Sequence, residues 1–195
     1  ETYYKILVPE KNSKGKGVRK GYLWVVVGIN TRMIYLLYDD GSRSEKVILN
    51  ELGGCKGIIQ SDGYSPYRKL ESDAYPHITR IPCLQHIKRK FIDCGEDEPD
   101  AKRIVELINT LYQNEHKHKI GVDGWTVEQN LVHRKKYAPD ILGEIKDVLD
   151  DIEERGDLLP KSELKEAVTY LRNEWNAVVD IFNYGDTYLD NNIVE

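Results

Sequence analysis

The sequence predicts an α/β protein with a mixed five-stranded sheet flanked by helices and an all-helical insertion. Two observations predict this fold class. Short β-branched and aromatic runs separated by turn residues occupy the first 82 positions, whereas apolar residues from position 84 onward recur at helical spacing. With 195 residues, 40% of them hydrophobic, the chain is large enough for one domain that carries an insertion.

Composition excludes several classes of protein. No apolar run approaches the roughly 18 residues that a membrane span needs, and no signal peptide opens the chain, so we expect no membrane partner. Three cysteines, an odd number, do not suggest a disulfide framework. A soluble protein of the reducing cytoplasm fits best.

The two halves of the chain carry opposite charge. Residues 1–92 contain 16 Lys/Arg against 9 Asp/Glu, a balance of +7, and residues 93–195 contain 12 against 24, a balance of −12. This asymmetry favours a surface that faces a polyanion beside a solvated or regulatory one, although ordinary surface charge is the alternative.

The N-terminal third predicts an antiparallel meander. Residues 3–8, 21–29 and 33–38 read as three strands, and the last two are joined by a short turn. Between the first two strands, residues 11–20 (KNSKGKGVRK) form a basic loop. This loop is either a phosphate-contacting finger or a solvated hairpin connection, and its DNA-binding candidates are Lys14, Lys16, Arg19 and Lys20.

Two βα units are expected to extend this sheet. Ser44 is placed to cap a short helix closed by Gly53, and the apolar pair Ile58-Ile59 predicts a buried strand. A helix through Leu70 and a strand at residues 78–81 follow. The resulting order, βββαβαβ, is the layout of a ribonuclease H-like core.

From position 84 the pattern becomes helical. An acidic loop at residues 93–100 and breaks at residues 121–124 and 156–160 separate the helices. We therefore divide the chain into a core (1–92), a helical insertion (93–160) and C-terminal helices that return to the core (161–195). The apolar stripes are expected to be packing faces: Ile104, Leu107, Ile108, Leu111 and Tyr112; Ile141, Ile145, Val148, Leu149 and Ile152; Leu164, Val168, Leu171, Trp175, Val178 and Phe182. The charged runs at residues 115–119 and 134–136 are typical of solvated helix ends.

Asp62 stands where the predicted strand at Ile58-Ile59 ends. Ligands and metals commonly bind at that edge of an open α/β sheet. The alternative is that Asp62 caps the following turn, because Asp-Gly is a common turn pair. Phosphodiester chemistry with two Mg²⁺ ions needs acids brought together from distant positions, and Asp62 and Glu195 are candidates for two of three such acids.

Four motifs in order resemble the catalytic domain of the insertion-sequence-66 family of bacterial DDE transposases. They are residues 21–25 (GYLWV), 60–64 (QSDGY), 83–86 (CLQH) with 89–91 (RKF), and 190–192 (DNN) with Glu195. The resemblance implies that Asp62 is the second catalytic and metal-binding acid and Glu195 the third. The family's first acid precedes a Glu-Thr pair, which here is Glu1-Thr2. We therefore expect the first Asp just before residue 1 and no activity from this fragment alone.

The resemblance also implies the activity and its partners. It predicts Mg²⁺- or Mn²⁺-dependent cleavage of transposon ends and strand transfer into target DNA by a homo-oligomer, with two ions in the intact protein. The rivals are a nuclease or resolvase on the same core, and a non-catalytic module that binds DNA or protein.

Cys83 and His86 have three interpretations. They are half of a zinc site, for which Cys94, His116, His118 and His133 are available without a recognisable spacing; or a buried pair that shapes a turn; or a site-proximal pair with His86 facing DNA or the metals. In the last case Lys88, Arg89 and Lys90 are phosphate contacts that supply affinity without sequence preference.

Overall fold

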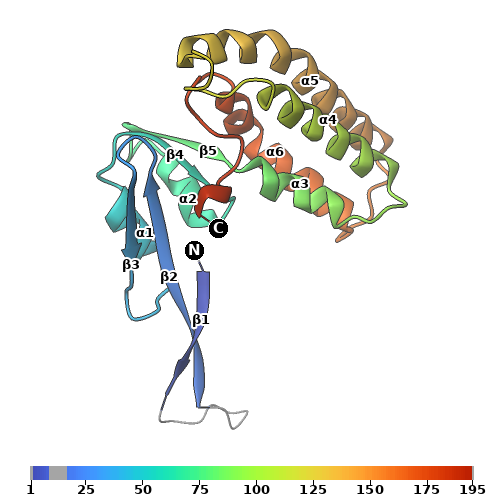
Figure 1. Cartoon of the computed structure of the whole chain (residues 1–195). Helices are drawn as coiled ribbons and strands as arrows, with labels where there is room; N and C mark the ends of the chain where they lie inside the picture. The colour runs from blue at the N-terminus through green and yellow to red at the C-terminus, as the bar shows by residue number, and fades with distance from the viewer. Residues whose placement is uncertain (1, 9–16, 195) are drawn as a thin grey trace. The chain divides into compact units, whose positions relative to one another are not determined.

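The computed structural model describes residues 2–8 and 17–194 (Figure 1). The predicted sites Glu195, Lys14 and Lys16 lie outside these residues. The chain forms two compact units. The first runs to Gly57 and includes Ser65–Ile78 and the residues from Asn192; the second comprises Ile58–Tyr64 and Thr79–Asn191.

The first unit contains the predicted meander. Strands β1 (Thr2–Leu7), β2 (Val18–Gly28) and β3 (Met33–Leu37) pair antiparallel in the order β1-β2-β3. The register places Tyr4 opposite Gly21, and Val26 opposite Tyr35. The meander predicted from β-branched and aromatic runs is therefore confirmed.

The core of the first unit is centred on Trp24 of β2, which is 1% exposed. Its indole Nε1 donates to Ser42 O at 3.1 Å, and the Tyr67 ring meets it edge-on at 6.3 Å. Helix α1 (Glu45–Leu52) contributes three further core side chains, and Ser44 caps it as predicted by accepting from Lys46 N. Helix α2 (Ser65–Arg68) and the 3₁₀ turn η1 (Lys69–Glu71) complete this unit together with the short η2 (Asn192–Val194).

Strands β4 (Gly57–Ser61) and β5 (Ile78–Pro82) form a separate two-stranded sheet. Gly57 N donates to His77 O, and Cys83 N donates to Ser61 O, so the two strands run parallel. Within the described residues, the five strands thus form a three-stranded and a two-stranded sheet, and one continuous sheet is not observed. The prediction that the Ile58-Ile59 strand is buried was wrong, because Ile58 is 38% exposed and Ile59 half-buried on a strand that pairs with β5 alone.

The second unit is built from four long or medium helices around one core. They are α3 (Leu84–Ile92), α4 (Pro99–Glu115), α5 (Val127–Arg155) and α6 (Glu163–Ile181). Helix α4 packs between α3 and α5, and α3 also packs on α6 (Figure 1). The predicted apolar stripes are confirmed as packing faces, because their residues are buried in this core or packed against it.

Helix α5 is the longest element, with 29 residues. A capping box between Thr126 and Gln129 begins it, and Gly156 in the left-handed conformation (φ 65°) ends it. In the described parts of the chain, neither α5 nor any other helix combines the length and apolar character that crossing a membrane requires.

Substitution of a buried and of an exposed leucine tests the packing of the helical core. Leu149 of α5 is fully buried, whereas Leu159 in the loop after α5 is 72% exposed. Leu149→Ala should lower the free energy of unfolding by about 2–5 kcal/mol, since it leaves a cavity, and Leu159→Ala by less than about 0.5 kcal/mol. Urea denaturation measures both. Equal losses from the two substitutions would contradict this packing.

Candidate active site

Asp62 lies directly after β4 and is half-buried. Its Oδ1 accepts a hydrogen bond from Tyr64 N at 3.0 Å, which makes a turn just before α2 begins. The capping interaction considered from the sequence is therefore present. Among the described residues, Oδ2 accepts no hydrogen bond, so the turn uses one of the two carboxylate oxygens.

The backbone that carries Asp62 is fixed by α6. Gly63 N donates to the Tyr170 hydroxyl at 2.9 Å. A Cβ at position 63 would lie 2.3 Å from that hydroxyl oxygen, so the close approach requires glycine. Burial, with smaller contributions from Glu174 and Asp62, raises the pKa of Tyr170 to about 12, so the phenol keeps its proton at neutral pH.

A buried ion pair joins β5 to the same helix. The Arg80 guanidinium donates to the Glu174 carboxylate, and the two side chains are 1% and 0% exposed. Glu174 and Tyr170 are four residues apart on α6, so they project from one face of the helix. Helix α6 therefore anchors both β5 and the turn at Asp62.

Three motif segments meet beside this turn. Gln60 Nε2 donates to Pro82 O at 3.2 Å and to Tyr188 O at 2.8 Å. Leu84 N, at the start of α3, donates to Leu189 O at 2.9 Å. We call this meeting of residues 60–62, 82–86 and 188–191 the junction. It brings residues 188–191 onto two segments that lie more than a hundred positions earlier in the sequence.

Cys83 is at the centre of the junction and is 1% exposed. Burial raises the pKa of its thiol, while the backbone N–H groups of Asn191, His86 and Gln85 act in the opposite direction. Both α3 and the returning chain therefore act on the pKa of this thiol. The interpretation of Cys83 and His86 as a buried pair that shapes the turn stays a prediction.

Among the described residues, no third zinc ligand joins Cys83 and His86. Cys94 lies beyond the other end of α3, and at about 1.5 Å of rise per residue a nine-residue helix separates the two thiols by more than about 13 Å. Within the parts of the chain that the structure describes, no three His, Cys, Asp or Glu side chains gather closely enough to hold a metal ion.

For a divalent metal, the described residues offer one predicted ligand, Asp62. The Asp62 carboxylate is half-buried at the end of a strand and keeps one oxygen for a ligand, which suits a hard cation. Asn191 Oδ1, also of the junction, is buried and accepts no hydrogen bond from the described residues. Glu195, the other predicted ligand, lies outside them.

The predicted DNA-binding residues fall into two groups. His86 belongs to the junction, and Lys88, Arg89 and Lys90 follow it on α3. Arg89 and Lys90 are exposed. Lys88 Nζ lies 6.0 Å from the centre of the Tyr112 ring, whose hydroxyl donates to Asp190 Oδ2 at 2.9 Å. In the first unit, Arg19 pairs with Asp40 at 2.8 Å, and Lys20 Nζ lies 4.2 Å from the Tyr3 ring.

Arg134 is a structural residue that the sequence interpretation missed. It was assigned to a solvated helix end, but it is 0% exposed. Its guanidinium pairs with Glu115 and donates to the carbonyls of Ile181, Tyr184 and Thr187. Its spacing to Ala138 and Ile141, four and seven positions on, places it on the buried face of α5 and was the available signal.

The comparisons agree with the motifs. The family described as "Transposase IS66 family" matches residues 1–195, and the chain belongs to this family. It is 28% identical to the uncharacterized protein y4jD of Sinorhizobium fredii (strain NBRC 101917 / NGR234) over 161 residues, which cover 79% of this chain and 30% of that protein. It is 25% identical to the uncharacterized protein y4qI of the same strain over 191 residues, 90% of this chain and 34% of that protein.

The chain thus spans about a third of the length of these curated relatives. No solved structure matches it. The family match supports a transposase role.

The Arg134–Glu115 pair makes stability depend on pH. Burial acts to raise the pKa of Glu115, but hydrogen bonds from Arg134, Tyr137 and Asn130 bring it below its ordinary value of 4.5. A lowered carboxyl pKa contributes stability above pH 4.5 that is lost as the pH falls further. Glu115→Gln should therefore cost about 3 kcal/mol at pH 7 and flatten the loss of stability between pH 5 and pH 3.

Glu144→Gln is the matched control, because its partner Arg103 is half exposed and such a pair contributes less than about 1 kcal/mol. The test is to measure the free energy of unfolding of both variants and of the unsubstituted chain from pH 7 to pH 3. An unchanged pH profile for Glu115→Gln would show that the buried pair does not have this role.

Proposed function

We propose that this chain is the catalytic core of a DDE transposase with a ribonuclease H-like topology. The observation that carries the proposal is the junction, which joins the motif at Asp62 to the Cys83 motif and the Asp190 motif. The element order βββαβαβ and the parallel β4–β5 pair support a ribonuclease H-like topology. Residues 93–160 would then be the insertion into that core.

The residues have distinct proposed roles. Asp62 and Glu195 would hold a divalent cation, Mg²⁺ or Mn²⁺, with a further acid completing the set. When bound, two such ions activate the attacking oxygen and stabilise the leaving oxygen of a phosphodiester. Tyr170, through Gly63, holds the backbone of Asp62 in place, and Lys88, Arg89 and Lys90 bind DNA phosphates.

The proposed reaction has two steps on DNA. Water attacks a phosphodiester at a transposon end and releases a 3′ hydroxyl. That hydroxyl then attacks a target phosphodiester and displaces its 3′ oxygen. Both steps are in-line displacements, and we propose that a homo-oligomer holds the two ends and the target.

One observation favours the non-catalytic rival, a module that binds DNA or protein. The Asp62 side chain already has a structural task in the turn with Tyr64. Asp62→Asn separates the two roles, because an asparagine Oδ1 still accepts from Tyr64 N but carries no charge for a cation.

The test uses the full-length protein that contains this chain, since the curated relatives extend far beyond the matched part. With DNA carrying the ends of its own element and Mg²⁺, Asp62→Asn should lower strand cleavage and strand transfer at least about a hundredfold while end binding is retained. Asp147→Asn, the same chemical change on the exposed face of α5, should leave both activities intact.

The outcomes separate the rivals. Strand transfer retained by Asp62→Asn would reject Asp62 as a catalytic acid. Cleavage without strand transfer by the unsubstituted protein would instead identify a nuclease or resolvase, and binding without Mg²⁺-dependent turnover would identify a binding module.

A further inference from the structure

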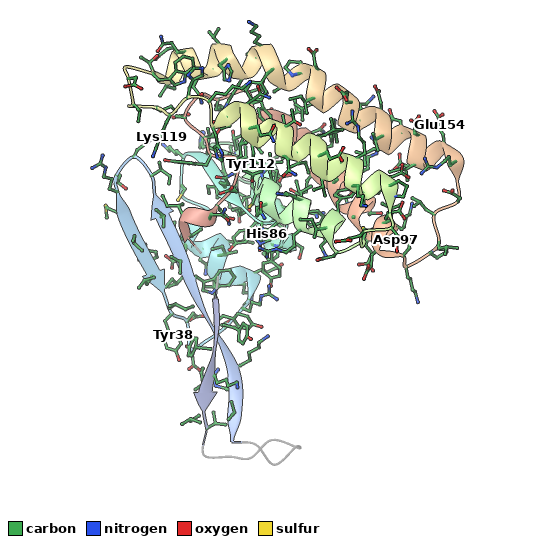
Figure 2. The ribbon with its side chains drawn as sticks, turned by 45° about the vertical axis from the view of Figure 1, so that its right-hand side comes forward. Tyr38, His86, Asp97, Tyr112, Lys119 and Glu154 are labelled. Atoms are coloured by element: carbon green, nitrogen blue, oxygen red, sulfur yellow. The ribbon has the colours of Figure 1, made fainter. Side chains whose placement is uncertain are left out.

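The helices of the second unit carry opposite charge at their two ends. Residues 140–157 contain eight Asp/Glu against two Lys/Arg, and both of these bases, Lys146 and Arg155, are paired with carboxylates. Figure 2 shows Asp97 and Glu154 at one end of the helices and Lys119 at the other. The bases at the acidic end are therefore neutralised within the protein.

At the opposite end lies a group of basic side chains, which we call the basic tip. Its members come from the loop after α4 and from α5, and all are exposed: His116, Lys117, His118, Lys119, Lys135 and Lys136. Lys117 Nζ donates to Asn114 Oδ1 at 2.8 Å, and Lys135 Nζ to Asn183 Oδ1, so both bind neutral amides.

The lysines of the basic tip differ in their partners from the bases of the acidic end. Within the described ranges, none of its four lysines forms an ion pair with a carboxylate. The acids of residues 116–136 are Asp123 and Glu128, and neither of them pairs with these lysines. The contrast with the paired bases of the acidic end indicates a surface that can accept a polyanion.

The loop that carries Lys117 and Lys119 has a defined conformation. The His118 ring stacks on Trp125 with centres 3.8 Å apart and planes 14° apart, and His133 meets His118 edge-on at 5.2 Å. Trp125 Nε1 donates to Asn130 Oδ1, and Gly121 N donates to Trp125 O. Little conformational entropy of this backbone remains to be lost on binding.

The basic tip continues toward the junction. The His116 ring lies 6.0 Å from the Tyr112 ring, and Lys88 Nζ lies at the same distance from the Tyr112 ring. Tyr112 in turn donates to Asp190 of the junction. Basic and aromatic side chains thus lead from α3 at the junction to the end of the α4–α5 hairpin, as the positions of His86, Tyr112 and Lys119 show (Figure 2).

We propose that the basic tip binds the sugar–phosphate backbone of duplex DNA without sequence preference. Exposed lysines without carboxylate partners release the counterions condensed on DNA when they contact phosphates, which supplies affinity and makes it depend on salt. The choice of DNA as the polyanion rests on the proposed transposase function. The tip would hold duplex at a second place, beyond the α3 lysines.

The salt dependence of binding tests this proposal. The full-length protein is titrated against a random-sequence duplex at several salt concentrations without divalent metal. Lys117→Gln/Lys119→Gln should weaken binding and reduce the slope of log K against log salt by about 1.8, which is two phosphate contacts at about 0.9 each. Lys135→Gln/Lys136→Gln should act in the same direction.

The matched control is Lys102→Gln/Lys165→Gln, which removes two exposed helical lysines outside the basic tip. Its slope should equal that of the unsubstituted protein. An unchanged slope for both tip variants, or an equal reduction in the control, would overturn the proposal. It would also be overturned if the tip variants altered sedimentation of the protein without DNA and left the slope unchanged, because the tip would then contact the acidic end of a second copy.

The two proposals fail separately. A tip variant with an unchanged slope, in a protein whose strand cleavage still requires Asp62, rejects only the role of the basic tip. A reduced slope in a protein that cleaves DNA without the Asp62 carboxylate rejects only the proposed catalysis.

Discussion

The buried guanidinium of Arg134 is the constraint on which the second unit depends. A charge that is 0% exposed must be paired and hydrogen-bonded, and Arg134 meets this need through Glu115 and the backbone after α6. Those contacts fix residues 181–187 against α4 and α5. The chain that leaves them, residues 188–191, then reaches Gln60, Cys83 and Leu84. The position of the Asp190 motif therefore follows from a charge buried among the helices.

A buried ion pair also fixes the backbone around Asp62. The Arg80–Glu174 pair ties β5 to α6, and Tyr170 from the same face of α6 holds Gly63. Gln60 connects the strand to the returning chain. Polar side chains from the strands and from α6 thus define where the Asp62 carboxylate stands.

Structural features that depend on local sequence pattern could be predicted from the sequence. The meander, the Ser44 cap and the apolar stripes of α4, α5 and α6 follow from periodicity and turn residues, and the structure confirms them. Sheet order does not follow from such patterns, because a strand's composition does not specify its neighbour. The expected single five-stranded sheet is accordingly not observed in the described residues, and Ile58 is more exposed than predicted.

The candidate site was predictable in its motifs but not in its contacts. Asp62 and Cys83 could be named from the sequence, whereas the bond from Gln60 to Tyr188 joins positions 128 apart. The partners of Arg134 lie 19 to 53 positions away, and its burial contradicts the rule that a charged run is solvated. Only its helical spacing to Ala138 indicated the core. Hydrogen bonds and ion pairs between residues far apart in the chain cannot be predicted from the pattern of a single sequence.

The central proposal is that Asp62 and Glu195 are ligands of the same divalent metal site. The most direct test is a crystal structure of the full-length protein with Mn²⁺, using the anomalous signal of the metal. The account predicts Mn²⁺ about 2.0–2.3 Å from an oxygen of Asp62, with Glu195 among the ligands of the same metal site. Mn²⁺ bound elsewhere, with ordered Asp62 and Glu195 carboxylates that share no metal, would contradict it.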